Sequence, residues 1–380
     1  MADTIRVRIV ADQIGQLIRS LAHRDYAIFG PAVKDGAIVY DRIEEIGDLP
    51  RGLTDHQEAG RYSLVPRQDQ ALFGYVLGPQ SWKKYFHPAR VKLFDARNDD
   101  GVFQILPNTA SPARPVALLG VRACELAAIA MQDRVLQNGP YADRIYAARR
   151  AGAFLVAVQC TQSAPTCFCH SMGTGPAVAA GTADITLTEM DVASDHWFLA
   201  EAGTDRGAEV LSELSFAPAT DTQCRAADEA VALARTGQRR HLDTAGLRDL
   251  LIENFEHPRW DEVARRCLVC ANCTMVCPTC FCTDIEDASD VSGTHAERWR
   301  RWDSCFTTSF SYIHGGSVRT SPKARYRQWI THKLATWIDQ FGTPGCVGCG
   351  RCITWCPAGI DITEEAQALR GTVNHGNTES

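Results

Sequence analysis

Two runs decide the fold of the last third of the chain: CLVCANCTMVCP at residues 267–278 and CVGCGRCITWCP at residues 346–357. Both have the spacing C-x2-C-x2-C-x3-C-P, in which three closely spaced cysteines are followed by a fourth that precedes a proline. This spacing lets a short loop place three thiolates around one corner of an iron–sulfur cubane, with its backbone N–H groups pointing at the sulfides. The runs therefore predict two [4Fe–4S] clusters.

The spacing also predicts which cysteines share a cluster. In bacterial two-cluster ferredoxins, the fourth cysteine of each run begins a helix and ligates the other cluster. One cluster is therefore expected on Cys267, Cys270, Cys273 and Cys356. The second is expected on Cys346, Cys349, Cys352 and Cys277. The alternative is a pair of zinc sites, but structural zinc uses two separated C-x2-C knuckles per ion rather than a continuous run closed by proline.

The composition is that of an ordinary folded protein. The chain has 380 residues, 45% of them hydrophobic, and its formal net charge of −6 argues against nucleic acid as the main partner. No stretch approaches the roughly 20 apolar residues that span a bilayer, and no signal peptide is visible, so we expect a cytoplasmic protein. In a reducing cytosol, 16 cysteines at short spacings indicate metal ligands rather than disulfides.

The first half of the chain predicts an α/β domain. Its opening pattern favours an amphipathic helix over 9–21, followed by short strands over 26–29, 37–40 and 73–77. A clearer pattern follows, with strands over 116–120 and 153–158 and helices over 126–135 and 141–150. This order is typical of a βαβ unit with parallel strands. Cys124 and Cys160 follow the two strands, and ligands gather at the carboxyl ends of strands in open α/β sheets.

A second cysteine constellation lies in this half, at Cys124, Cys160, Cys167 and Cys169. Four thiolates that converge from separate loops could hold a third [4Fe–4S] cluster, and buried structural cysteines are the alternative that spacing alone leaves open. We interpret the remaining cysteines as non-ligating, namely Cys224, Cys280, Cys282 and Cys305. No G-x-G-x-x-G follows a strand, so no nicotinamide or Rossmann flavin site is expected. No catalytic acid–base or Ser/His/Asp set is visible.

The predicted fold class is an α/β N-terminal domain plus a helical, bacterial-ferredoxin-like dicluster domain at the C-terminus (α+β). The polar, Ala-rich composition around residues 216–245 marks the boundary. We expect an α/β domain over 1–220, a linker over 221–245, a dicluster domain over 246–370 and a tail over 371–380. A helix is expected from Asp243 to Glu256, before Pro258.

The dicluster domain carries a long insertion, 283–345, which is too long to be a structureless loop. It has an acidic stretch at Asp284, Glu286, Asp287 and Asp290. A basic stretch follows, made of Arg298, Arg300, Arg301, Arg319, Lys323, Arg325, Arg327 and Lys333. These charges form either a solvated face, or a surface for an acidic partner, or a compensation for the charge of anionic clusters.

These motifs, together with Trp-Asp-Ser-Cys305 and the His332-Lys333 helix before the second run, resemble the beta subunit of sulfhydrogenase-type, NAD(P)-linked nickel–iron hydrogenases. The corresponding cluster-carrying chain of anaerobic sulfite reductases belongs to the same group. The resemblance runs from Gly78 to Asp361 and departs from the family at Ala123, where a proline is usual. It implies a third cluster on Cys124, Cys160, Cys167 and Cys169.

The resemblance also implies a function. Family members carry electrons between a flavin subunit that handles NAD(P)H and a catalytic subunit, so we expect a non-catalytic electron-transfer subunit of a hetero-oligomeric complex, with a hydrogenase as the leading partner. Arg122 and Arg351, adjacent to predicted ligands, are candidates for raising the local potential. The alternatives are a sulfite reductase partner, an enzyme whose cluster or flavin acts on its own substrate, and a redox or iron sensor.

Overall fold

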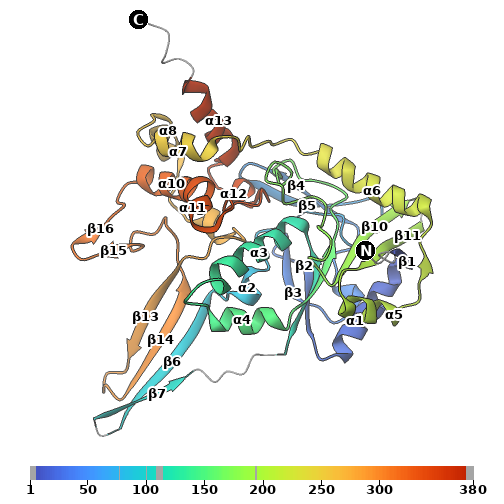
Figure 1. Ribbon diagram of the computed structural model, residues 1–380, viewed down its shortest axis with the longest axis horizontal. Coiled ribbons are helices and arrows are strands. Elements are labelled where there is room, and N and C mark those ends of the chain that lie inside the picture. The colour runs from blue at the N-terminus through green and yellow to red at the C-terminus, as the bar shows by residue number, and fades with distance from the viewer. Residues whose placement is uncertain (1–5, 77, 100, 108–113, 193–194, 374–380) are drawn as a thin grey trace, which may run out of the picture.

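The computed structural model describes residues 6–76, 78–99, 101–107, 114–192 and 195–373 (Figure 1). Its first half is built on an eight-stranded mixed sheet with the order β12-β1-β11-β10-β9-β8-β2-β3. The strands are β1 (Arg6–Val10), β2 (Ala27–Lys34), β3 (Ala37–Arg42), β8 (Val116–Val121), β9 (Phe154–Val158), β10 (Ile185–Val192), β11 (Asp195–Ala202) and β12 (Ala217–Pro218). The four central strands β10, β9, β8 and β2 are parallel to their neighbours in that group, and the outer pairings are antiparallel.

Helices cover both faces of this sheet. They are α1 (Ile14–His23), α3 (Ala123–Gln137), α4 (Arg144–Ala151), α5 (Asp205–Ser212) and α6 (Asp221–Thr236). On one face, α1 and α5 bury Ile14, Leu17 and Val210 against the strands. On the other face, α3 and α4 bury Ile129 and Tyr146. The sheet is therefore the middle layer of three.

The βαβ unit predicted from the sequence is confirmed, because β8 and β9 pair in parallel with α3 and α4 between them. The opening helix is also present, and Ile14, Leu17, Ile18 and Leu21 are completely buried. Val10 does not belong to it, because it ends strand β1 and is 44% exposed. Residues 73–76 form no strand, and Leu77 lies outside the described residues.

A second sheet joins distant parts of the chain. Its order is β13-β14-β6-β7, all antiparallel, and its strands are β6 (Arg90–Asp99), β7 (Val102–Pro107), β13 (Thr283–Ser289) and β14 (His295–Trp302). It forms an arm at the lower left of Figure 1, and two small hairpins complete the strands: β4 (Leu53–Glu58) with β5 (Arg61–Pro66), and β15 (Tyr312–Ile313) with β16 (Gly316–Ser317). Because β14 pairs with β6, the first part of the insertion, residues 283–302, is bound to the N-terminal part of the molecule.

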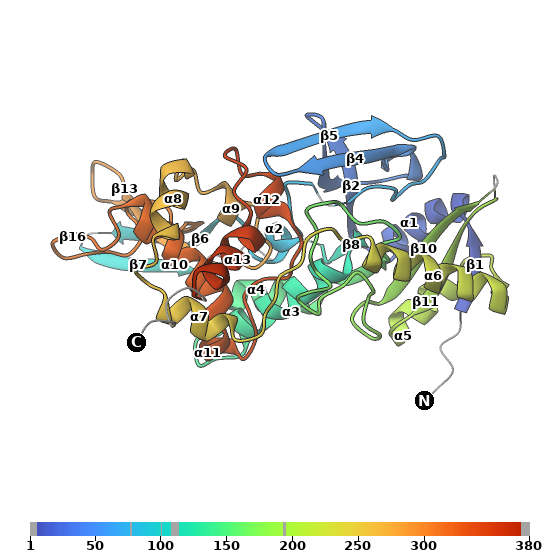
Figure 2. The ribbon, with the colours of Figure 1, turned by 90° about the horizontal axis from the view of Figure 1, so that it is seen from above.

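The remaining helices are short, and most of them pack around the two cysteine runs. They are α2 (Lys83–Phe86), α7 (Leu247–Glu253), α8 (Arg259–Arg266), α9 (Asn272–Met275), α10 (Pro322–Thr331), α11 (Trp337–Phe341), α12 (Arg351–Thr354) and α13 (Ile362–Val373). A π-helical turn, His332–Thr336, joins α10 to α11. Leu251, Trp260 and Ile353 are completely buried in their shared core. Figure 2 shows this helical region and the large sheet lying end to end.

The structure refines the predicted boundaries. The expected α/β domain plus a C-terminal dicluster region is confirmed, but the segment expected as a linker contains α6, which packs on β10 and β11. The helix expected over 243–256 is shorter, because Gly246 has a left-handed φ of 61° and α7 begins after it. Residues 374–380 of the expected tail lie outside the described residues, and no helix in the described part of the chain is long and apolar enough to cross a membrane.

Candidate metal centres

Both cysteine runs fold into the same loop. The backbone is left-handed at Val269 (φ 55°) and Ala271 (φ 66°) in the first run, and at Gly348 (φ 62°) and Gly350 (φ 76°) at the equivalent places in the second. Each loop then enters a one-turn helix, α9 or α12. This conformation suits glycine but is strained for a β-branched valine, so the first run adopts the loop against its local preference.

The loops direct backbone N–H groups at cysteine sulfur. The Gly348 N–H donates to Cys346 Sγ over 3.4 Å, and the Ile360 N–H donates to Cys356 Sγ over 3.4 Å. Burial raises the pKa of Cys267, and the backbone N–H of Val269 opposes that rise. Hydrogen bonds of this kind stabilise the thiolate, which is the form that binds metal.

The first predicted group of ligands comes together around Cys273. Burial raises the pKa of this thiol well above its ordinary value, and the neighbouring thiols raise it further, in the order Cys305, Cys267, Cys356 and Cys270. The other three predicted ligands are thus its neighbours. Cys356 arrives from the end of the second run, as the crossed pattern of the two runs requires. Cys270 is the exposed member of the group.

The second predicted group comes together around Cys352. Burial raises its pKa, and the nearby thiols raise it further, in the order Cys346, Cys349, Cys277 and Cys273. The first three are the other predicted ligands of this group. Cys273 belongs to the first group, so the two groups are direct neighbours.

A buried lysine accompanies the second group. Lys333 Nζ donates to Cys277 Sγ over 3.2 Å and to Gly345 O over 2.9 Å, and the side chain is 3% exposed. Burial lowers the pKa of Lys333, but the thiolates of Cys277 and Cys280 raise it well above its ordinary value, so the ammonium group stays charged. Lys333 therefore compensates negative charge at this site. Charge compensation was one of the three interpretations of the charged stretches in the sequence.

The four cysteines of the first half also meet. Burial raises the pKa of Cys124, at the start of α3, and the thiols of Cys169, Cys349 and Cys160 are among its charged neighbours. Burial likewise raises the pKa of Cys167, and the nearby thiols of Cys169 and Cys160 raise that pKa further. These four form a third group, with Cys349 of the second group beside it.

Two polar side chains serve the third group. Arg122 donates to the carbonyls of Phe73 and Tyr75, over 2.7 and 2.9 Å, and its guanidinium lowers the pKa of Cys160 against the rise that burial causes. Gln238 Nε2 donates to Cys169 Sγ over 3.0 Å. Gln238 follows α6, so the segment expected as a linker contributes to this site.

The loops of the second and third groups are packed backbone to backbone. The Phe168 N–H donates to the Gly348 carbonyl over 2.8 Å, and Thr174 Oγ1 donates to the Val347 carbonyl over 2.7 Å. A Cβ at Gly348 would lie 2.6 Å from the Phe168 carbonyl, and one at Gly350 would lie 2.4 Å from Thr166 O. Glycine at both places is what permits this contact, because any side chain would separate the loops.

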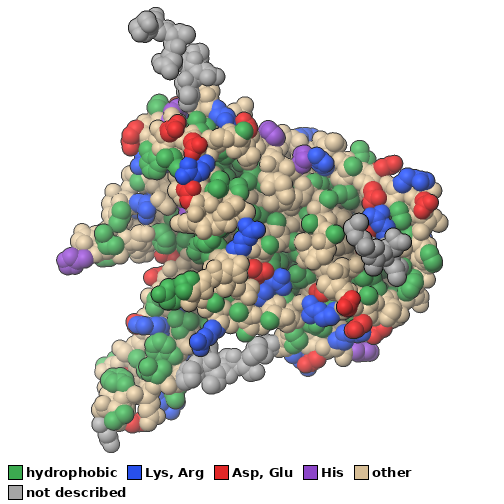
Figure 3. Space-filling view, in the orientation of Figure 1, with side chains coloured by type: hydrophobic (Ala, Val, Ile, Leu, Met, Phe, Trp, Pro, Cys, Tyr) green, Lys and Arg blue, Asp and Glu red, His purple; other side chains and the backbone are tan. Residues whose placement is uncertain are grey.

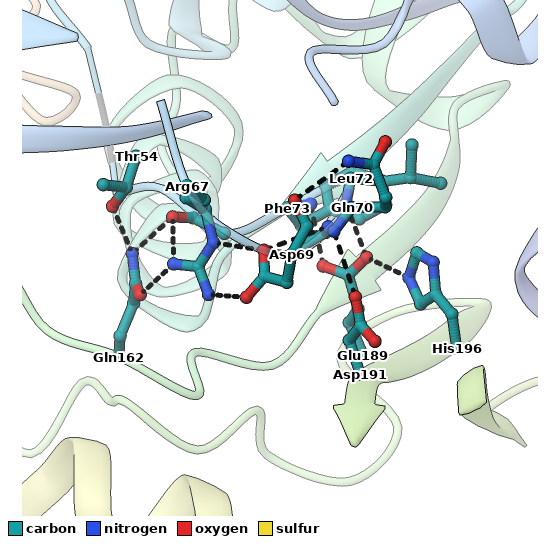
Figure 4. Close-up of polar contacts among 12 residues, drawn as sticks. Thr54, Arg67, Asp69, Gln70, Leu72, Phe73, Gln162, Glu189, Asp191 and His196 are labelled. Atoms are coloured by element: carbon teal, nitrogen blue, oxygen red, sulfur yellow. Dashed lines mark hydrogen bonds and ion pairs between the residues drawn. The ribbon is translucent and has the colours of Figure 1, made fainter. Parts of the chain in front are cut away.

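A polar network ties the third-group loop to the sheet (Figure 4). Gln162, between Cys160 and Cys167, accepts from Arg67 Nη1 over 3.0 Å and donates to Thr54 Oγ1 over 3.1 Å. Beyond it, Glu189 on β10 accepts from the backbone N–H groups of Leu72 and Phe73, over 2.6 and 2.8 Å. The residues before β6 therefore act as a brace between the loop and the large sheet.

The spacing of the thiols discriminates between clusters and single ions. In the part of the chain that the structure describes, the one group of three metal-ligating side chains with all donor atoms within 4.8 Å is Asp95, His295 and Glu297, which contains no cysteine. Four thiolates at 2.3 Å from one zinc would bring their sulfurs within about 3.8 Å of each other. No three thiols in the described residues come that close together, which argues against a preformed single-ion zinc site on the cysteines.

Several other residues of the basic stretch form ion pairs within the molecule. Arg298 pairs with Asp287 at 2.6 Å and Arg301 pairs with Glu286 at 2.9 Å across the β13–β14 hairpin. Lys323 pairs with Asp261 at 3.1 Å. Arg298 and Arg301 thus pair with the acidic stretch, and Lys323 pairs with a carboxylate outside it, so these basic side chains are engaged within the molecule.

Sequence reasoning missed three features of the site. It did not find the buried ion pair between Arg351 and Glu125, or the role of Gln238, because long-range pairing leaves no local signal. It also interpreted Cys280, Cys282 and Cys305 as non-ligating and did not predict that they line one pocket. The repeated Thr-Cys-Phe-Cys at 166–169 and 279–282 was the available signal.

Comparison with known proteins finds an iron–sulfur family over the two cysteine runs. Residues 266–360 match the family described as a 4Fe-4S dicluster domain, which implies two [4Fe–4S] clusters in this region. The chain is 31% identical over 337 residues to the Sulfhydrogenase 2 subunit beta of Pyrococcus furiosus, an alignment that covers 87% of this chain and 95% of the relative.

Proposed function

The chain belongs to the family of sulfhydrogenase beta subunits, and on that premise we propose that it relays electrons between a flavin subunit that handles NAD(P)H and a catalytic subunit. The catalytic partner we favour is a nickel–iron hydrogenase. The name of the similar protein, a sulfhydrogenase subunit, supports the choice of a hydrogenase. The match to a 4Fe-4S dicluster domain supports [4Fe–4S] clusters as the cofactors. A [4Fe–4S] cluster supplies one-electron chemistry when bound, and the protein provides its ligands, its spacing and its electrostatic surroundings.

We assign the ligands by group. The first cluster takes Cys267, Cys270, Cys273 and Cys356, and the second takes Cys346, Cys349, Cys352 and Cys277. The third takes Cys124, Cys160, Cys167 and Cys169. The grouping of the thiols and the N–H donors at Cys346 and Cys356 support these assignments.

One observation carries the relay: the three groups form a continuous series. Cys273 of the first group neighbours Cys352 of the second. Cys349 of the second group neighbours Cys169 of the third. Because a backbone hydrogen bond and the Thr174 side chain join the loops of the second and third groups, the fold fixes the spacing of these groups. A fixed, short spacing is what electron transfer between centres requires.

The surroundings of the second and third groups suit the negative charge of a cluster. Lys333 contacts Cys277, Arg122 contacts the third-group loop, and Arg351 separates Cys349 from Cys352 in sequence. A permanent positive charge stabilises the reduced, more negative state of a nearby centre, so these residues should raise the local potentials, Arg351 less than the others because Glu125 pairs with it.

The surface offers places for partners. At the first group, Cys270 is exposed and Leu268 beside it is 66% exposed, which leaves this end of the series open to a redox partner. The arm presents further apolar side chains (Figure 3), and Val102, Phe103 and Ile105 are each more than 60% exposed. Exposed apolar surface of this kind is typical of interfaces between subunits. We assign the arm to contact with another subunit of the complex.

Purification of the native complex under anaerobic conditions tests the proposal. This chain should contribute at least about twelve irons, four for each [4Fe–4S] cluster. The clusters should become reduced when NAD(P)H is added to the complex, and nickel should be present in the catalytic subunit. Sirohaem in place of nickel would favour the sulfite reductase alternative, and flavin on this isolated chain would favour an enzyme in its own right. Zinc in place of iron would contradict the proposal.

A further inference from the structure

Three cysteines outside the proposed ligand groups line a single pocket. They are Cys280, Cys282 and Cys305. The side chains of His332, Trp329 and Trp337 also line this pocket. Burial raises the pKa of Cys305 to about 12, and the neighbouring Cys282 thiol contributes to that rise. Two of these cysteines follow the first run, and the third arrives from the insertion after β14, so the fold assembles the site from separate segments.

Two indole groups in this pocket lack a hydrogen-bond partner. Trp329 and Trp337 are 4% and 2% exposed, and within the described structure neither Nε1–H has an acceptor. A buried donor without an acceptor destabilises a protein by about 1–3 kcal/mol. Donors left unpaired on the wall of a pocket therefore point to a bound group with acceptor atoms, and the sulfides of an iron–sulfur cluster are acceptors.

The sequence around two of the cysteines repeats that of a proposed cluster loop. Thr279-Cys280-Phe281-Cys282 has the same residues as Thr166-Cys167-Phe168-Cys169 of the third group. The charge is also suitable, because Lys83 Nζ donates to the Cys280 carbonyl over 2.9 Å and Lys333 lines the pocket. Buried cations favour an anionic group at this place.

We propose that Cys280, Cys282 and Cys305 bind a fourth iron–sulfur cluster, with His332 at the remaining corner. Within the described structure these thiols do not close to the 4.8 Å that a single ion would need, which favours a cluster over zinc. Imidazole is a known cluster ligand, and the hydrogen bond between His332 Nε2 and Gln340 Oε1, at 3.3 Å, would orient the ring.

The position of this site relates it to both C-terminal groups. Cys305 neighbours Cys273 of the first group, and Cys280 neighbours Cys277 of the second. A cluster here would lie beside the series rather than at its end, and would give the chain a branch. This inference goes beyond the proposed function, which requires the three groups alone.

Iron content and electron paramagnetic resonance of the anaerobically purified full chain test the inference. The wild type should hold about sixteen irons, four for each of four clusters. Cys282→Ala and Cys305→Ala should each lose about four irons relative to the wild type, with one reduced-cluster signal missing. The matched control is Cys224→Ala. Cys224 lies on α6 and packs against an apolar cluster, so this variant should lose no iron. His332→Ala should keep most of the iron and change the g-values of that same signal.

The outcomes separate this inference from the proposed function. A wild type with about twelve irons, or variants at Cys282 and Cys305 with unchanged iron, would overturn the fourth site and leave the three-group relay intact. One zinc per chain that is lost in Cys305→Ala would also overturn it. The wild-type iron count gives its answer even if the cysteine variants fail to fold.

Discussion

Arg351 and Glu125 form an ion pair in which each side chain is only 1% exposed. Arg351 precedes Cys352 of the second group, and Glu125 follows Cys124 of the third. The guanidinium also donates to the Gly78 and Gln80 carbonyls, over 2.9 and 2.8 Å. This pair therefore connects two proposed cluster sites that are far apart in sequence.

Removal of one charge from this pair should be strongly destabilising. Glu125→Gln leaves the Arg351 guanidinium buried without its counter-ion, which typically costs about 3–5 kcal/mol. We expect a clear fall in the thermal midpoint of the anaerobic protein, together with partial loss of iron. The control is Asp287→Asn, which breaks the exposed pair with Arg298 and should leave the midpoint unchanged. Equal midpoints for both variants would show that the buried pair does not hold the sites together.

The left-handed positions of the two runs should respond differently to substitution. Gly348→Ala introduces a Cβ at 2.6 Å from the Phe168 backbone, so the loops of the second and third groups must separate. We expect loss of iron from one or both groups. Val269→Gly at the equivalent place in the first run removes strain of about 1–2 kcal/mol and should keep all the iron. Full iron in Gly348→Ala would contradict the proposed contact between the groups.

The crossed ligation can be tested at Cys277. Cys277→Ser should perturb the cluster assigned to Cys346, Cys349 and Cys352 and leave the one assigned to Cys267 largely intact. The reason is geometric, since Cys277 neighbours Cys352 and contacts Lys333. Electron paramagnetic resonance of the reduced variant distinguishes the two clusters. If the signal of the Cys267 cluster disappears instead, each run serves its own cluster.

The contact between Glu189, which holds the brace on the large sheet, and His196 should depend on pH. His196 Nε2 contacts Glu189 Oε1 at 2.8 Å (Figure 4). Burial lowers the pKa of His196, whereas the carboxylates of Glu189 and Asp191 raise it, and the net shift is upward from 6.5. A folded pKa above the unfolded value means that the protonated form stabilises the fold below about pH 6.5, and that this contribution is lost as pH rises through the folded pKa. The difference in thermal midpoint between wild type and His196→Gln should therefore be largest at acid pH. A difference that does not vary with pH would contradict the ion pair.

The sequence predicted the parts of the molecule that have a local signal. The prediction of two [4Fe–4S] clusters rested on cysteine spacing, and the dicluster match confirms it. The prediction of the βαβ unit rested on hydrophobic periodicity, and the parallel pairing of β8 with β9 confirms it. The pairing of β14 with β6 had no such signal, because strand partners far apart in sequence are set by packing of the whole chain. The sequence therefore predicted the whole insertion within the dicluster domain, whereas residues 283–302 complete a sheet with the N-terminal part of the chain.

The same limit applied to the candidate sites. Regular spacing identified the ligands of the two runs, whereas Cys280, Cys282 and Cys305 have no regular spacing and were interpreted as non-ligating. Charge stretches were ambiguous in sequence, since Arg298 finds Asp287 only once the hairpin has formed. Lys333 became distinguishable from the other basic residues through its burial beside Cys277.

The central claim is that three cysteine groups in series carry electrons, and this claim depends most on the third group. The most direct test is the iron content of the native complex with Cys124→Ala, measured beside the wild type. The account predicts a loss of about four irons, with the signals of the two dicluster centres retained and electron flow slowed far more than assembly of the complex. Full iron with full activity in this variant would contradict it, and would make the N-terminal region a docking module.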